Sequence, residues 1–70
     1  MQDVLENSVW SHHSGRVYKV LFFTNGEGER APKYPKTVVY ENVDNGNRYS
    51  RPLDDWHRSM TLIRNPTIAS

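Results

Sequence analysis

The sequence predicts a mainly β fold in one small domain, and three observations support this prediction. Segments rich in β-branched and aromatic residues follow one another along the chain, each bounded by glycine, asparagine or proline. The 70 residues leave room for only one hydrophobic core. A long connection early in the chain and a short helical segment before the last strand match a small SH3-like antiparallel barrel better than a sandwich or a helical bundle. We expect one domain over residues 1–70, with its core at about 8–63 and a tail at 64–70.

Two strands at the start of the chain are expected to pair as an antiparallel hairpin. The first covers residues 8–12, and the second covers residues 15–24 and carries bulky side chains on both faces. The second strand is therefore expected to be central in the sheet. Small and turn-forming residues at 13–15 allow a tight turn between the two strands.

A second hairpin is expected from Thr37 to Arg51. The Asn45-Gly46 step suits a type I′ turn, because both central residues of that turn have a positive φ. Pro52 ends the returning strand, because proline has no amide hydrogen for the strand ladder.

A short helical turn and a closing edge strand at 60–63 complete the expected fold. The helical turn is predicted because three apolar residues share one helical face: Leu53, Trp56 and Met60. Taken together, these elements predict a core of Val9, Trp10, Tyr18, Val20, Phe22, Val38, Tyr40, Leu53 and Trp56.

The composition excludes several classes of protein. The chain has no cysteine, which excludes disulfides, iron–sulfur clusters, zinc fingers and thiol catalysis, and fits a reducing cytoplasm. A net charge of +1 does not by itself drive binding to a polyanion. No run of about 18 apolar residues is present, and acidic residues stand where a signal peptide would carry positive charge. We therefore expect a cytoplasmic protein that makes no contact with a membrane.

Four short blocks of the sequence carry a resemblance to a known family: Trp10-Ser11-His12-His13-Ser14-Gly15, Tyr18-Lys19-Val20-Leu21, Thr37-Val38-Val39-Tyr40 and Arg51-Pro52-Leu53. In this order and spacing they resemble a family of uncharacterised small bacterial and phage proteins, a domain of unknown function. That family has aromatic-x-His-x-x-Gly, Tyr-x-Val-Leu, Val-Val-Tyr and Arg-Pro-Leu blocks. The resemblance spans residues 9–60 and implies a compact β domain with no established catalytic residue. The segments at 25–36 and 54–60 look more like those of phage-encoded members, which implies action in the cytoplasm of a bacterial host cell.

The connection from Asn25 to Lys36 is the first candidate binding surface, because most strand connections run only about 2 to 5 residues. Its second half alternates cations with prolines and a tyrosine, so that it is basic, semi-rigid and amphipathic. Such a segment loses little entropy on docking and steers an acidic partner toward it. We therefore predict that a host or phage protein binds at Arg30, Lys33, Tyr34 and Lys36. A solvated loop kept soluble by its charges is the alternative.

A second candidate surface lies on neighbouring strands of the expected sheet and consists of Arg16, Lys19, Arg48, Tyr49 and Arg51. Small β-barrels hold single-stranded nucleic acid or a nucleotide by stacking a base on an aromatic ring beside arginines. Nucleic acid or a nucleotide-like phosphorylated ligand is therefore the alternative partner, provided that the arginines share one face. The tyrosines also fit a place in the core, and Arg51 also fits an ion pair with Asp54 or Asp55.

The three histidines are weaker candidates for chemistry. Three imidazoles are enough for an open metal site, but His12 and His13 are adjacent, and adjacent strand residues point to opposite faces. His57 has aspartates nearby that could orient it as an acid or base, but no nucleophile is identifiable beside it. We therefore predict a non-enzymatic binding module with no catalytic residue, metal or cofactor. Formation of a homodimer is left as an alternative, because small barrels expose edge strands that pairing would protect.

Overall fold

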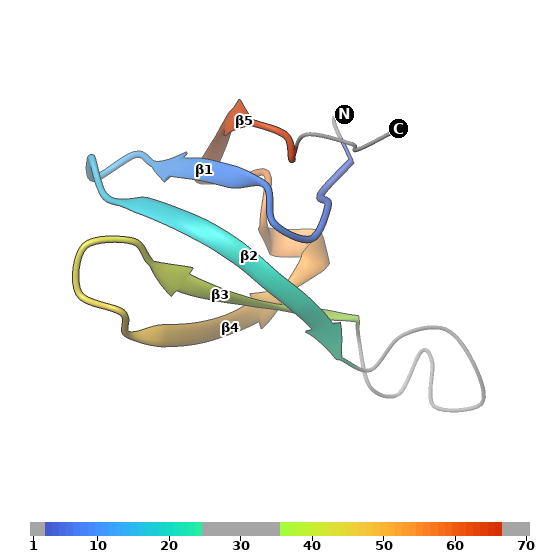
Figure 1. Ribbon diagram of the computed structural model, residues 1–70. Helices are drawn as coiled ribbons and strands as arrows, with labels where there is room; N and C mark the ends of the chain where they lie inside the picture. The colour runs from blue at the N-terminus through green and yellow to red at the C-terminus, as the bar shows by residue number, and fades with distance from the viewer. Residues whose placement is uncertain (1–2, 25–35, 67–70) are drawn as a thin grey trace.

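The computed structural model describes residues 3–24 and 36–66 and contains one antiparallel sheet with one short 3-10 helix. The sheet consists of β1 (Val9–His12), β2 (Val17–Thr24), β3 (Thr37–Asn42), β4 (Arg48–Pro52) and β5 (Met60–Arg64). The strand order is β4-β3-β2-β1-β5, and the 3-10 helix η1 (Leu53–Asp55) joins β4 to β5 (Figure 1). The prediction of a mainly β fold is confirmed, and so are the two hairpins, the short helical turn and the last strand.

The sheet is not a closed barrel. β4 and β5 are its two edges, and each hydrogen-bonds to one neighbouring strand in the described part of the chain. Figure 1 shows β1 and β5 on one side of the molecule and β3 and β4 on the other, with β2 crossing between the two pairs. The chain passes from β4 through η1 before it enters β5, so these two strands do not pair directly. The long loop expected after the second strand falls at 25–35, outside the described residues.

Side chains alternate between two faces of the sheet, which we name by what they carry. The inner face carries the buried cluster, which consists of Trp10, Tyr18, Val20, Val38, Tyr40, Trp56 and Met60. The outer face is the opposite one, and its residues include Lys19, Glu41 and Arg48. This division is what an antiparallel sheet with one packed face produces.

A β-bulge at Leu21 exchanges the two faces in the second half of β2. Val20 and Phe22 pair with consecutive residues of β3, so Leu21 is one extra residue in β2. Phe22 consequently lies on the outer face and is 45% exposed, whereas Phe23 pairs with the buried Val38 and packs against the core. The prediction that Phe22 belongs to the core is wrong, because strict alternation does not show where a strand contains an extra residue.

Two other predicted core residues lie at the edge of the core. Val9 is half-buried because it pairs with Lys19 and belongs to the outer face, and Leu53 is half-buried in η1. Met60 is buried in their place, opposite His12 at the start of β5.

The side chain of Asn42 closes the hairpin between β3 and β4. Asn42 is buried, and its Oδ1 accepts hydrogen bonds from the backbone N–H groups of Asp44 (2.8 Å) and Asn45 (3.3 Å). Its own backbone N–H donates to the carbonyl of Asn47 at 2.9 Å. In this loop only Gly46 has a positive φ (76°), whereas a type I′ turn needs two such residues. The hairpin was predicted correctly, but its turn type was not.

No helix in residues 3–24 and 36–66 has the length and apolar character needed to cross a membrane.

Candidate ligand-binding surface

A row of ring-bearing side chains crosses the inner face of the sheet, one from each of four strands. It consists of His12 (β1), Tyr18 (β2), Tyr40 (β3) and Tyr49 (β4). The centroid of the Tyr18 ring is 6.4 Å from that of His12, 5.1 Å from that of Tyr40 and 6.1 Å from that of Tyr49, each in an edge-to-face arrangement. Tyr40 and Tyr49 are direct cross-strand partners, with ring centroids 5.9 Å apart. These distances are those of favourable aromatic pairs, so the row is held together by its own contacts.

Two buried tryptophans pack against the row. The ring centroid of Trp56 is 5.0 Å from that of Tyr40 and 5.7 Å from that of Trp10. Trp10 Nε1 donates a hydrogen bond to Ser8 Oγ at 2.8 Å, and Ser8 Oγ in turn donates to the carbonyl of Leu5. Hydrogen bonds therefore fix Trp10 beneath the row, whereas the buried Nε1 of Trp56 has no partner among the described residues.

Exposure differs sharply along the row. Tyr18 and Tyr40 are each 7% exposed, whereas Tyr49 is 43% exposed. The pKa of Tyr40 is raised, chiefly by burial. The charge of Arg51 and a hydrogen bond from Arg51 oppose this rise, whereas Tyr18 and Tyr49 add to it. Tyr49 is therefore the tyrosine of this row that offers ring surface to a ligand.

Arg51 lies beside the exposed Tyr49. The two residues are two positions apart on β4, so they share the inner face. The guanidinium donates to Ser59 Oγ at 2.6 Å and forms no ion pair with a described carboxylate. The ion pair expected with Asp54 or Asp55 is absent from the described interactions. Arg51 is half-buried, so its positive charge is only partly hydrated, and no carboxylate of residues 3–24 and 36–66 neutralises it.

The environment of His12 is also positive. Burial lowers the pKa of this imidazole, and electrostatic interactions with three neighbouring basic side chains lower it further: His13, Arg51 and Arg16, in that order. Its Nδ1 accepts the backbone N–H of Ser14 at 3.1 Å and lies 2.8 Å from Ser14 Oγ. A ring nitrogen that accepts a backbone N–H carries no proton, so the neutral ring holds its hydrogen on Nε2.

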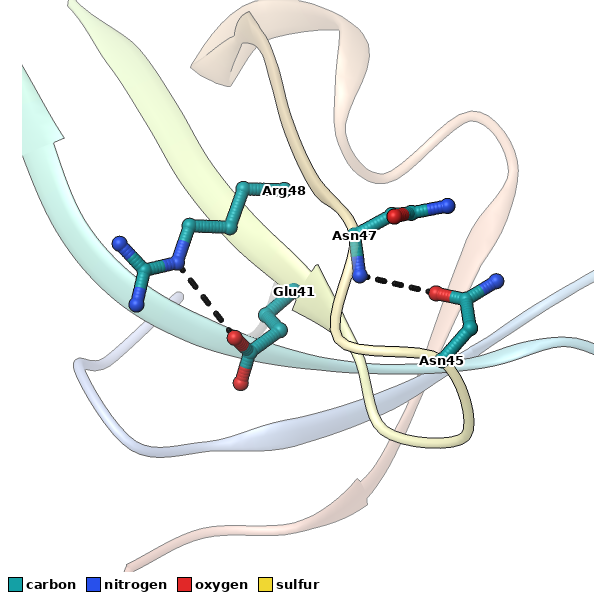
Figure 2. A network of polar contacts seen from close by, with 4 residues as sticks. All are labelled: Glu41, Asn45, Asn47 and Arg48. Carbon is teal, nitrogen blue, oxygen red and sulfur yellow. Dashed lines mark hydrogen bonds and ion pairs between the residues drawn. The ribbon is translucent and has the colours of Figure 1, made fainter.

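The basic residues of the second predicted surface do not share one face. The register places Lys19 opposite Glu41 and Glu41 opposite Arg48 on the outer face, whereas Tyr49 and Arg51 belong to the inner face. Glu41 Oε1 is 3.4 Å from Arg48 Nε, so that the charge of Arg48 is paired. Figure 2 shows these two side chains directed toward each other from neighbouring strands. Of the second predicted surface, Tyr49 and Arg51 therefore stay together on the inner face, and Lys19 and Arg48 are separated from them.

Arg16 and His13 lie near His12 but outside the strands of the sheet. Arg16 is exposed just before β2 and is near enough to His12 to lower its pKa. His13 lies in the turn after β1, and its ring centroid is 4.1 Å from that of His12. His13 has left the strand, so the opposite-face rule for adjacent strand residues does not apply to this pair. Sequence reasoning did not connect His12 with Arg51, because their proximity depends on the fold.

Of the first predicted surface, Arg30, Lys33 and Tyr34 lie outside the described residues. Lys36 is exposed, and its Nζ is 4.8 Å from the centroid of the Phe23 ring. Its backbone carbonyl accepts the N–H of Leu53 at 2.9 Å, which ties the start of β3 to η1.

His57 is not arranged with the aspartates that sequence reasoning considered. Its ring centroid is 5.6 Å from that of Trp10, and Asp55 Oδ1 is 3.1 Å from a guanidinium nitrogen of Arg58. Within residues 3–24 and 36–66, no three His, Asp or Glu side chains come together as metal ligands.

Comparison with protein-family models finds no match to this chain, and comparison with curated proteins and with solved structures finds no significant similarity. The family resemblance of the sequence blocks stays a prediction.

Proposed function

We propose that the protein is a non-enzymatic binding module that holds a phosphorylated ligand at the inner-face corner, which we define as His12, Tyr49 and Arg51. One observation carries this proposal: a half-buried arginine that pairs with none of the described carboxylates lies beside an exposed tyrosine ring on the same face. A guanidinium presents a planar fork of donors that matches phosphate oxygens. An exposed tyrosine adds a face on which a planar group stacks.

The proposal includes an SH3-like scaffold for this corner. Support comes from the small antiparallel sheet, in which β1 lies between β2 and β5, and from η1 immediately before the last strand. In such a scaffold the sheet supplies rigid positions, and residues of several strands build one surface.

The absence of catalysis is part of the same proposal. The contact between Ser14 Oγ and His12 Nδ1 resembles a nucleophile and its base, but the same nitrogen also accepts the Ser14 backbone N–H. No described carboxylate hydrogen-bonds to His12 to orient its ring from the other side. We therefore assign this contact to the structure of the turn.

The test of this function compares two arginines of one strand. Arg51→Gln removes the charge of the inner-face corner, whereas Arg48→Gln removes an equivalent charge from the outer face of β4. Equilibrium dialysis against labelled nucleotides and single-stranded oligonucleotides, at low and high salt, measures binding by the two variants and the wild-type protein. We expect wild-type protein and Arg48→Gln to bind and Arg51→Gln to lose binding, with melting curves showing that both variants are folded at the assay temperature. Absence of binding by the wild-type protein, or an equal loss in both variants, would contradict the proposal.

A second candidate function is binding of a host protein through the basic loop, as a phage or prophage accessory protein in the bacterial cytoplasm. The described residue that favours it is Lys36, which is exposed at the end of that loop and close to Phe23. Joint replacement of Lys33, Tyr34 and Lys36 by alanine should remove a nuclease-resistant partner recovered from bacterial lysate. Unchanged recovery of that partner would reject this candidate.

A further inference from the structure

We propose that the inner-face corner takes a mononucleotide-like ligand, a single planar ring with one terminal phosphate group, rather than a strand of nucleic acid. This inference rests on the proposed function and narrows its ligand. Three features of the corner support it: the number of exposed rings, the distribution of positive charge, and the spacing between ring and charge.

The corner has one exposed tyrosine ring. Proteins that bind single strands stack successive bases on successive aromatic side chains. Here Tyr18 and Tyr40 are 7% exposed and contact Tyr49 with their rings, so Tyr49 is the tyrosine of this row that can receive a base. Another exposed aromatic ring, Phe22, is on the outer face beyond the bulge and cannot continue the same track.

The positive charge of the corner is concentrated rather than spread along a path. Arg51 has no carboxylate partner in the described part of the chain, and Arg16 is near enough to lower the pKa of His12. Across the sheet, Arg48 is paired with Glu41. A strand needs a basic groove that follows its backbone, whereas a terminal phosphate carries about −1.5 to −2 charge at one point near pH 7. A local cluster of cations matches the terminal phosphate.

The spacing of the two main groups fits one nucleotide. Tyr49 and Arg51 are two residues apart on a strand, which separates their Cα atoms by about 6.6 Å on the same face. A base stacked on Tyr49 therefore places the phosphate of its own sugar within reach of the Arg51 side chain. His12 adds the Nε2–H of a neutral ring as a donor that needs no protonation.

The deciding experiment is a calorimetric titration of the full chain at neutral pH with four compounds. These are a nucleoside 5′-monophosphate, the same nucleoside without phosphate, inorganic phosphate, and a single-stranded oligonucleotide of about 12 residues without terminal phosphates. We expect the monophosphate to bind at least about tenfold more tightly than each of the other three, because only it engages both Tyr49 and Arg51.

Three variants test which residues hold which part of the ligand. Tyr49→Ala should weaken the binding of the monophosphate by about tenfold or more and leave the binding of inorganic phosphate unchanged. Arg51→Gln should weaken the binding of both compounds. Arg48→Gln, on the opposite face, should change the binding of neither compound. If Arg51→Gln fails to fold, Arg51→Lys keeps the charge without the planar fork, and it should still bind the monophosphate more weakly than the wild-type protein does.

The outcomes separate this inference from the function on which it rests. Tighter binding of the oligonucleotide than of the monophosphate, lost in Arg51→Gln, would overturn the mononucleotide inference and leave the binding function standing. Failure of all phosphorylated compounds to bind the wild-type protein would overturn both.

Discussion

A few single side chains determine the electrostatic character of the inner-face corner. Arg51 pairs with none of the described carboxylates, and burial and the neighbouring basic side chains lower the pKa of His12. Neither property belongs to the residue type alone. Each comes from neighbours that the fold brings from other strands, which is why the sequence did not predict them.

The lowered pKa of His12 predicts a pH-dependent stability. In the unfolded chain this imidazole has its ordinary pKa of about 6.5, and in the folded protein its pKa is lower. Below about pH 6.5 the unfolded state therefore binds the proton first, so the His12 contribution to the free energy of unfolding falls as the pH falls. Urea unfolding of the wild-type protein should show a larger loss of stability between about pH 7 and pH 5 than His12→Gln shows. Equal losses in the two proteins would contradict this assignment.

Ser8 is the residue whose removal tests the hydrogen bonds beneath the row. Ser8→Ala leaves Trp10 Nε1 without its acceptor at a position that is fully buried. An unsatisfied buried donor costs about 1–3 kcal/mol, so the free energy of unfolding should fall by that amount in urea titration. Ser50→Ala, on the exposed part of β4, is the matched control and should change stability by less than about 0.5 kcal/mol. A loss no larger than that of the control would show that Trp10 does not depend on Ser8.

At the scale of the elements, local sequence signals located the strands but not their irregularities. The segments at 17–24 and 37–42 are rich in β-branched and aromatic residues, and both form strands as predicted. The Asn42 side chain binds backbone N–H groups two and three residues further along, whereas the bulge at Leu21 depends on how β2 pairs with β3. A pattern within one segment contains no information about that pairing.

The bulge makes a testable distinction between two adjacent phenylalanines. Phe23→Ala removes a ring that packs against the core, whereas Phe22→Ala removes one from the exposed outer face. Phe23→Ala should therefore cost at least about 2 kcal/mol and Phe22→Ala about 1 kcal/mol or less, as measured by urea unfolding. The reverse order would mean that β2 alternates without a bulge, as the sequence pattern alone predicts.

At the scale of the whole molecule, the fold class was predictable and the closure of the sheet was not. Chain length, strand patterns and the short turn after Pro52 predicted a small mainly β domain. Closure depends on whether the two edge strands, β4 and β5, pair with each other, and in the structure they lie at opposite ends of the sheet. The candidate site was predicted in part: Tyr49 and Arg51 were selected correctly as neighbours on one strand, but Lys19 and Arg48 belong to the other face.

The central claim is that a phosphorylated ligand binds the inner face of β4 and not its outer face. The most direct test observes the side-chain Nε–H signals of Arg51 and Arg48 by NMR during titration with a nucleoside monophosphate. The two arginines lie on one strand, so a general effect of the added ligand would move both signals. We predict a saturable shift of the Arg51 signal and an unchanged Arg48 signal, because Arg48 stays paired with Glu41. Equal shifts of both signals, or no shift of Arg51, would contradict the claim.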